Sequence, residues 1–395
     1  MKVNYLIVGG GITAGSAARR IRELDPDGSI TILSSEPYLP YHRPPLSKDL
    51  WTGKKNVEEI FLEKEQFYLD NSIEIKTATQ VTSINAGAKR VSTSTGDEFL
   101  FDKLLLATGG TPRKLNIPGS EMSEICYYRN LSDYKRIREM VSGGKKAVVI
   151  GGGFIGSEIA AALTINDIAT TIIFPGQTLC RNVFPPDLGD ALMQTYREKG
   201  VVIDNEDAPV AFANKFGKTS VLTKKGYSFE ADIIIAGIGI SPNSELARNA
   251  GLSVANGIIV NEFLQTSNEH IFAAGDVALF PFSALDRQIR VEHWDNALNQ
   301  GAYAGANMVS VNDTYTHIPY FFSDLFEFGY EAVGDVNTEL EIFADWNEQF
   351  KTGVLYYLSD NNVKGIMLCN RWNKIDITRE TIGLNVTKED LRGAI

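Results

Sequence analysis

Two stretches of the chain repeat one order of apolar, glycine-rich and helix-like segments. The first reads VNYLIVGGGITAGSAARRIREL at 3–24 and SITILSSE at 29–36, and the second reads KKAVVIGGGFIGSEIAAALTIN at 145–166 and ATTIIFP at 169–175. Short apolar runs bounded by glycine predict buried strands, and the longer runs with many small residues predict packed helices. Each stretch is therefore expected to form a strand, a turn, a helix and a second strand, which is the beginning of a dinucleotide-binding fold.

The glycines recur with the same spacing at both predicted turns. The two motifs are Gly9-x-Gly11-x-x-Ala14 and Gly151-x-Gly153-x-x-Gly156. The first glycine permits a tight turn, the second lets the backbone approach a pyrophosphate, and the third small residue lets the helix pack on the strand. The helix N-terminus then offers its partial positive charge to phosphate. One such motif is common, but two in the correct context indicate two bound dinucleotides.

The residue that would contact the ribose differs between the two stretches. Glu36 closes the second predicted strand of the first stretch, and Pro37 ends that strand. A carboxylate there accepts hydrogen bonds from the ribose hydroxyls of a dinucleotide that has no 2′-phosphate; a solvated loop acid is the alternative. In the second stretch the matching position is Phe174, so no acid favours NADH. Arg181 fits either a 2′-phosphate or an exposed surface, so the choice between NADH and NADPH stays open.

Composition excludes several classes of protein. The 395 residues carry 38 basic and 49 acidic side chains, a net charge of -11, which disfavours binding to nucleic acid or to a membrane surface. Two lysine-rich segments, 135–146 and 214–225, could still dock an acidic partner, although a solvated surface explains them as well. No apolar stretch is long enough to cross a bilayer, and the first residues read as a buried strand rather than a signal peptide.

Cysteine and histidine usage points to a reducing compartment and to a site without metal. The three cysteines, Cys126, Cys180 and Cys369, stand far apart and form no CxxC pair. This pattern suits the cytoplasm and argues against a disulfide framework. None of the four histidines pairs with another histidine or a cysteine at metal-ligand spacing, so a metal site is not expected.

Further segments give the chain a family resemblance. They are YHRPPLSKDLW at 41–51, LLLATGGTPR at 104–113, AGIGISPN at 236–243, IFAAGDVA at 271–278 and VEHWDNALNQGAYAGANM at 291–308. Together with the glycine motifs, this combination resembles the FAD-dependent pyridine-nucleotide oxidoreductases of the ferredoxin and rubredoxin reductase type, a superfamily that includes apoptosis-inducing factor. The resemblance covers essentially the whole chain.

The resemblance implies a fold of three domains in the α/β class. Two Rossmann-like domains of the glutathione-reductase type are expected, with a small α+β domain at the C-terminal end. The implied boundaries are residues 1–115 and 245–315 for a discontinuous FAD-binding domain, 116–244 for an NAD(P)H-binding domain and 316–395 for the C-terminal domain.

The resemblance also implies roles for particular residues. Asp276 would bind the ribityl chain of FAD. Arg43 would contact the FAD phosphates or ribose, and Arg129 would reach the flavin nucleotide from the start of the NAD domain. Lys48 and Glu158 would pair beside the reactive nitrogen of the flavin; from spacing alone they could equally be two unrelated surface charges. The remaining positions expected to contact the flavin or nicotinamide nucleotide are Gly9, Gly11, Ala14, Glu36, Thr108, Gly109, Gly151, Gly153, Ile155, Gly156, Gly239, Gly275, Glu292, His293, Trp294 and Phe322. Relatives often have tryptophan at the position of Phe322.

The missing thiols limit how electrons can leave the flavin. Flavoprotein disulfide reductases need a dithiol beside the flavin, and peroxide-reducing relatives use one reactive cysteine. The segment after Glu36 contains neither. The sequence therefore predicts an NAD(P)H oxidoreductase whose flavin passes electrons directly to an external acceptor, with a ferredoxin or rubredoxin as the simplest candidate; a quinone, another small molecule or oxygen is also open.

Two rival functions remain at this point. A redox-controlled binding protein like apoptosis-inducing factor would form a long-lived complex of reduced flavin and nicotinamide. A nucleotide sensor without flavin would leave the motifs around Glu36, Thr108 and Asp276 unexplained. A homodimer is compatible with the sequence, and the oligomeric state is not fixed by it.

Overall fold

A computed structural model of the chain describes residues 1–141, 145–215, 218–282, 285 and 287–395. Parts of both lysine-rich segments, at 142–144 and 216–217, lie outside the described residues. The chain forms two compact units. Unit 1 comprises residues 1–42, 57–111 and 241–319, and unit 2 comprises 43–56, 112–240 and 320–395.

The main sheet of unit 1 is built on the first glycine motif. Its spatial order is β3 (Ile73–Lys76), β2 (Ile30–Leu33), β1 (Lys2–Val8), β6 (Glu98–Leu106), β5 (Arg90–Thr93) and β4 (Val81–Asn85), and β19 (Ile271–Ala273) also pairs with β6. Strands β1, β2, β3, β6 and β19 run parallel, whereas β4 and β5 pair antiparallel. The central strands are apolar on both faces, as expected for parallel strands covered by helices.

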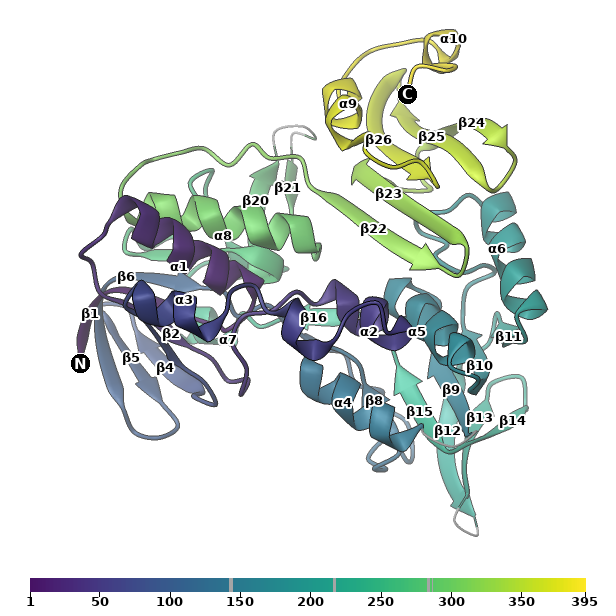
Figure 1. Cartoon of the computed structure of the whole chain (residues 1–395), viewed down its shortest axis with the longest axis horizontal. Coiled ribbons are helices and arrows are strands. Elements are labelled where there is room, and N and C mark those ends of the chain that lie inside the picture. The colour runs from purple at the N-terminus through teal and green to yellow at the C-terminus, as the bar shows by residue number, and fades with distance from the viewer. Residues whose placement is uncertain (142–144, 216–217, 283–284, 286) are drawn as a thin grey trace. The chain divides into compact units, whose positions relative to one another are not determined.

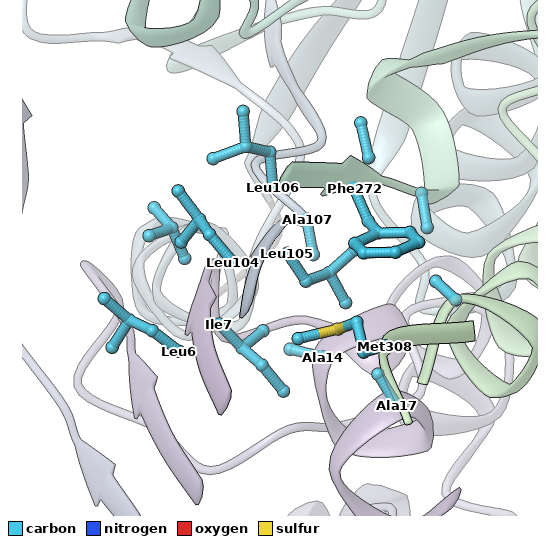
Figure 2. Packing of buried hydrophobic residues seen from close by; sticks show 14 of the residues in the cluster. Leu6, Ile7, Ala14, Ala17, Leu104, Leu105, Leu106, Ala107, Phe272 and Met308 are labelled. Carbon is cyan, nitrogen blue, oxygen red and sulfur yellow. The ribbon is translucent and has the colours of Figure 1, made fainter. Parts of the chain in front are cut away.

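Helices α1 (Ile12–Leu24) and α8 (Trp294–Met308) pack closely on this sheet. A Cβ atom added to Gly305 would lie 2.6 Å from the carbonyl oxygen of Ala17, and one added to Gly301 would strike the carbonyl oxygen of Thr13. The two helix backbones can therefore approach only because these α8 positions are glycine. Figure 2 shows Met308 beside Ala14 and Ala17 in the apolar cluster that this packing encloses.

The rest of unit 1 consists of short elements. They are η2 (Val57–Ile60), α3 (Glu65–Asp70), α7 (Glu245–Asn249), η3 (Gly275–Val277) and a sheet in the order β17 (Val254–Ala255), β18 (Gly257–Ile259), β20 (Ala278–Phe282) and β21 (Arg287–Ile289). Strands β7 (Gly110–Pro112) and β16 (Ile240–Pro242) lie where the chain passes from one unit to the other.

Unit 2 contains the second glycine motif in a five-stranded parallel sheet. The spatial order is β11 (Val202–Asn205), β10 (Ala169–Phe174), β9 (Lys146–Ile150), β15 (Ile233–Ala236) and β8 (Ile125–Tyr127). Its helices are α4 (Leu131–Met140), α5 (Phe154–Ile165) and α6 (Pro186–Glu198), and an antiparallel sheet follows with β12 (Pro209–Lys215), β13 (Lys218–Thr223) and β14 (Ser228–Ala231). The sequence-based prediction of two dinucleotide-binding folds is confirmed by these two parallel sheets.

Two further segments complete unit 2. The C-terminal segment forms an antiparallel sheet in the order β22 (Tyr320–Leu325), β23 (Phe328–Gly334), β26 (Asn362–Cys369), β25 (Thr352–Ser359) and β24 (Glu341–Glu348), with α9 (Ile375–Thr381) and α10 (Lys388–Leu391) after it (Figure 1). Residues 43–56 contribute η1 (Pro44–Ser47) and α2 (Asp49–Thr52). The predicted α+β character of this C-terminal segment is confirmed, while the exact domain boundaries stay a prediction.

Other expectations can be compared with the described part of the chain. Strand β2 ends at Leu33, so Glu36 lies in a bend after the strand instead of closing it. No described helix is both long and apolar enough to span a membrane. Among the described residues there is no group of three or more histidine, cysteine or acidic side chains that could hold a metal ion.

Candidate active site

The first glycine turn of unit 1 has the geometry that a pyrophosphate needs. Gly9 has φ +119°, and a Cβ atom there would strike the carbonyl oxygen of Ala107. In contrast, a Cβ atom on Gly11 would meet no protein atom within 4 Å. Gly11 is the N-cap of α1, whose Ala14 is fully buried. The first position thus needs glycine for the turn, and the second keeps space open at the helix N-terminus.

The second glycine turn, in unit 2, repeats this arrangement. Gly151 has φ +114°, and its Cβ atom would strike the carbonyl oxygen of Gly237. A Cβ atom on Gly153, the N-cap of α5, would again meet nothing within 4 Å. Gly156 packs directly against the carbonyl oxygen of Gly151, so only glycine fits there. Ile155 between them is 40% exposed, unlike the buried helix residues that follow it. Both turns therefore leave open the space at the helix N-terminus that the pyrophosphate of a dinucleotide needs.

Glu36 is held in place by a neighbour in unit 1. Its carboxylate accepts a hydrogen bond of 2.7 Å from the Tyr41 hydroxyl, and the Glu36 side chain is half-buried. The carboxylate is therefore oriented in the bend that follows β2, the region in which an acid contacts an adenine ribose.

Asn243 fixes the chain segment that contains Thr108 and Gly109. The Thr108 hydroxyl donates to the Asn243 carbonyl oxygen at 2.8 Å, and the Asn243 side-chain amide donates to the Thr108 carbonyl oxygen at 2.9 Å. The Asn243 backbone N–H also donates to the Gly109 carbonyl oxygen, and Gly109 has φ +61°. Asn243 was not predicted as a site residue, although the SPN sequence at 241–243 was part of a motif.

The loop of Gly275 and Asp276 packs against α1 and α8. The Gly275 N–H donates to Oε1 of Gln300 at 2.8 Å, and a Cβ atom on Gly275 would lie 2.5 Å from Oγ1 of Thr13. Asp276 is half-buried in η3. Its carbonyl oxygen accepts from Arg290, which also forms an ion pair of 2.6 Å with Glu292. These contacts fix the backbone that presents the Asp276 carboxylate.

His293 and Trp294 begin α8 in unit 1. Burial lowers the pKa of His293 to about 4, despite the opposing charges of Asp276 and Asp295. The indole Nε1 of Trp294 donates to Nδ1 of His42 at 2.9 Å. His42 was missed as a site residue, and only its place beside Arg43 in the YHRPPLSK segment could have indicated it.

The predicted pair of Lys48 and Glu158 is present in unit 2. Lys48 Nζ lies 2.7 Å from Glu158 Oε1, and the side chains are only 10% and 4% exposed. Lys48 follows η1, whose two prolines stiffen the segment, and Glu158 lies on α5, the helix of the second glycine motif. The alternative of two unrelated surface charges is therefore wrong.

Two serines that were not predicted complete the contacts of Glu158. Ser47 Oγ donates to Glu158 Oε2 at 2.5 Å, and Ser323 Oγ donates to Glu158 Oε1 at 2.6 Å. Phe322, beside Ser323 on β22, has the Lys48 ammonium 5.4 Å from its ring centroid. A buried charge is tolerated when its hydrogen-bonding capacity is met, and here three donors meet both carboxylate oxygens. Serine spacing gave no signal for this arrangement.

Arg43 and Arg129 lie together in unit 2. Nη1 of Arg43 donates to the carbonyl oxygen of Arg129 at 2.7 Å. Next to Arg129, the Tyr128 hydroxyl donates to the Leu46 carbonyl oxygen and accepts from the indole N–H of Trp51. These bonds attach residues 43–56 to the segment that leads into α4.

Gly239 occupies the loop after β15. It has φ +90°, and its carbonyl oxygen accepts from the Arg113 backbone N–H at 2.9 Å. The positive φ requires glycine, so its predicted cofactor contact would be a backbone contact.

The cysteines of this chain are poor nucleophiles. All three are free and buried, and burial raises the pKa of Cys180 to about 12 and also raises the pKa values of Cys126 and Cys369. A thiol needs a lowered pKa to react readily at neutral pH. The fold and the site thus define an oxidoreductase with two dinucleotide folds, and its three cysteines are all buried.

Comparisons with known proteins identify the family. A model of the family described as pyridine nucleotide-disulphide oxidoreductase matches residues 3–301. Apoptosis-inducing factor 1, mitochondrial, from Dictyostelium discoideum is 32% identical, covering 98% of this chain and 79% of that protein. Putidaredoxin reductase from Pseudomonas putida is 35% identical, covering 84% of this chain and 80% of that protein.

A solved structure agrees with these sequence relatives. The crystal structure of the covalent putidaredoxin reductase–putidaredoxin complex matches with a TM-score of 0.93 and 32% identity, covering 98% of this chain and 95% of the matched one. The chain belongs to the pyridine nucleotide-disulphide oxidoreductase family. The predictions of the family, of an oxidoreductase and of FAD and NAD(P)H as cofactors are thereby confirmed.

Proposed function

We propose that this protein is an NAD(P)H-dependent reductase of a small ferredoxin- or rubredoxin-type electron carrier. The similarity to putidaredoxin reductase supports this proposal. The observation that carries it is the presence of two open glycine turns in a chain whose cysteines are all buried. Electrons that enter from a nicotinamide nucleotide must then leave from the flavin itself. The three free cysteines also favour a cytoplasmic location.

The residues of each dinucleotide fold have distinct tasks in this proposal. When bound, FAD accepts a hydride from the nicotinamide nucleotide and delivers two electrons singly to the carrier, with release of one proton. In unit 1, Gly11 leaves space for the FAD pyrophosphate, while Glu36 and Asp276 accept hydrogen bonds from hydroxyl groups. In unit 2, Gly153 does the same for the pyrophosphate of NAD(P)H.

We assign Lys48 the task of stabilising the negative charge that the flavin acquires on reduction. A preorganised cation is most effective where water is excluded, and Lys48 is only 10% exposed. Glu158 orients the ammonium group, and Ser47 and Ser323 orient Glu158.

An anaerobic titration tests the proposed function. The purified protein should be yellow, should bleach on addition of NADH or NADPH, and should recover its oxidised spectrum rapidly when a one-electron carrier is added. Absence of flavin after reconstitution with FAD, or recovery that no carrier accelerates, would overturn the proposal.

The similarity to apoptosis-inducing factor supports a second candidate, a redox-controlled binding protein. Its signature in the same titration would be a lasting long-wavelength charge-transfer band with slow recovery in the presence of carriers. The rate of recovery thus decides between the two candidates.

The hydrogen bond from Ser323 gives a sharper test of the assigned task of Lys48. We expect Ser323→Ala to shift the flavin midpoint potential to a more negative value, because Glu158 without this donor compensates more of the Lys48 charge. Loss of one hydrogen bond to a charged group costs roughly 1.5–3 kcal/mol, and the potential would register part of that cost. Ser323→Thr, which keeps the hydroxyl, should restore the potential. An unchanged potential in Ser323→Ala would contradict the assignment.

A further inference from the structure

The two dinucleotide folds can be aligned with one another through matching backbone hydrogen bonds. The Gly9 N–H donates to the Leu33 carbonyl oxygen at 2.9 Å, and the Gly151 N–H donates to the Ile173 carbonyl oxygen at the same distance. These bonds join the first glycine of each motif to the strand beside it. Leu33 and Ile173 are therefore equivalent positions.

The next residue of each glycine turn and the next residue after each matched strand position keep this alignment. A Cβ atom on Gly10 would strike the Ser34 side chain, and one on Gly152 would lie 2.6 Å from the Phe174 ring. The Ser34 carbonyl oxygen accepts from the Thr79 N–H at 2.7 Å, as that of Phe174 accepts from the Asp207 N–H at 3.2 Å. Phe174 is thus the counterpart of Ser34.

The counterpart of Glu36, the expected ribose-binding acid, lies two residues after Phe174. The Glu36 carbonyl oxygen accepts from the Ala78 N–H at 3.1 Å, and the Gly176 carbonyl oxygen accepts from the Glu206 N–H at 2.9 Å. The position equivalent to Glu36 is therefore Gly176, and the sequence-based match to Phe174 was two residues too early. The second fold has a glycine at the position where the first has its acid.

The side chain of Arg181 occupies the space that this glycine leaves. A Cβ atom on Gly176 would lie 2.9 Å from Arg181 Cδ and 3.5 Å from its Nε. The loop that carries Arg181 is fixed, because the Cys180 N–H donates to the Gly152 carbonyl oxygen at 2.7 Å and the Thr338 hydroxyl donates to the Arg181 carbonyl oxygen at 3.0 Å. Arg181 is exposed, and within the described residues its guanidinium has no ion-pair partner.

We propose that Arg181 binds the 2′-phosphate of NADPH, so that this protein prefers NADPH to NADH. An acid at this position would accept bonds from the 2′-hydroxyl and repel a 2′-phosphate, whereas an arginine that packs on the glycine attracts the phosphate. The inference rests on the proposed function, in which the second fold takes the nicotinamide nucleotide.

Other charged groups near this position partly cancel. Lys225 Nζ donates to the Asn205 carbonyl oxygen and lies 3.8 Å from the Asp204 carboxylate. The buried carboxylate of Asp207 interacts with Asp204, and burial together with this neighbour raises the pKa of Asp204. Glu206, whose backbone bonds to Gly176, is exposed and opposes the phosphate from a solvated position. We therefore expect Glu206→Gln to strengthen NADPH binding modestly.

The first experiment measures flavin reduction by stopped flow at varied NADPH and NADH concentrations in the wild type and in Arg181→Gln. The wild type should reach half-maximal rate at a lower NADPH than NADH concentration. Arg181→Gln should weaken NADPH binding roughly 10- to 100-fold, the usual effect of losing hydrogen bonds to a charged group, and should change NADH binding far less. Arg197→Gln, an exposed arginine on α6 of the same unit, is the matched control and should change neither.

A second measurement separates this inference from the proposed function. Adenosine 2′,5′-bisphosphate and AMP compete with the nucleotide without donating hydride, and the bisphosphate should inhibit better only when Arg181 is present. Failure of both nucleotides to bleach the flavin would refute the proposed function. Efficient bleaching with a preference for NADH, or an equal effect of Arg181→Gln on both nucleotides, would refute only the NADPH assignment.

The double variant Gly176→Glu with Arg181→Gln recreates the acid of the first fold. We expect this variant to prefer NADH to NADPH.

Discussion

Replacement of Glu158 by glutamine should lower the free energy of unfolding by about 3 kcal/mol, within the range for breaking a buried ion pair. The Lys48 ammonium is 10% exposed and would lose its counter-charge. Glutamine also places an amide donor among three groups that all donate to the carboxylate, namely Lys48, Ser47 and Ser323. At least one buried donor would then lack an acceptor. The shift of the urea midpoint, recorded with excess FAD, measures the loss.

A matched exposed pair provides the control for this prediction. Lys218 and Glu230 lie 3.3 Å apart on β13 and β14 with side chains that are 69% and 54% exposed. Exposed pairs contribute roughly 0–1 kcal/mol, so Glu230→Gln should barely move the midpoint. Equal shifts for Glu158→Gln and Glu230→Gln would show that burial of the Lys48–Glu158 pair does not determine its strength.

The double variant Lys48→Met with Glu158→Leu distinguishes stability from catalysis. Apolar replacement of both partners of a buried pair is often neutral or stabilising, but Ser47 and Ser323 would lose their acceptor. The double variant should therefore recover only part of the stability that Glu158→Gln loses. Flavin reduction should nevertheless stay slow, because the cation is missing in the double variant. Recovery of both properties together would mean that the pair serves only the fold.

The parts of the structure that the sequence predicted are those determined by local backbone requirements. Gly9 and Gly151 need positive φ, and Gly156 has no room for a side chain. Such requirements produce glycines at a fixed spacing, which can be recognised in the sequence. By contrast, the Lys48–Glu158 pair joins residues that are far apart in sequence, and only the family resemblance indicated it.

The residues that were missed make contacts across long sequence separations or depend on where a strand ends. Ser323 contacts Glu158 from a strand near the C-terminal end, and no periodicity reveals such a contact. The error at Phe174 has a simpler cause. The sequence-based match took Glu36 and Phe174 each as the last residue of its predicted strand, directly before a proline. Strand β2 ends three residues before Glu36, whereas β10 extends to Phe174 itself, so the hydrogen-bond pattern was needed to identify Gly176.

The two open glycines predict a reciprocal loss of cofactors, which is the most direct test of the assignment of the two folds. A Cβ atom on Gly11 or Gly153 meets no protein atom within 4 Å, and neither glycine has a positive φ. Valine at either position should therefore leave the fold intact while its side chain occupies the space through which the backbone approaches a pyrophosphate. We expect Gly153→Val to keep bound FAD but to need roughly 100-fold more nicotinamide nucleotide for bleaching, since several charge-assisted hydrogen bonds are lost.

Gly11→Val should show the opposite result, with FAD lost on purification and nicotinamide binding retained. Flavin absorbance at 1:1 stoichiometry and equilibrium binding of the adenine nucleotide measure the two properties separately. Gly200→Ala provides a control for glycine replacement as such, because Gly200 follows α6 and a Cβ atom there also would meet no protein atom within 4 Å. Gly200 has φ +93°, so we expect Gly200→Ala to lose some stability. We expect it to lose neither cofactor. Loss of FAD in Gly153→Val with retention in Gly11→Val would reverse the assignment of the two folds, because the space at each helix N-terminus would then accommodate the other nucleotide.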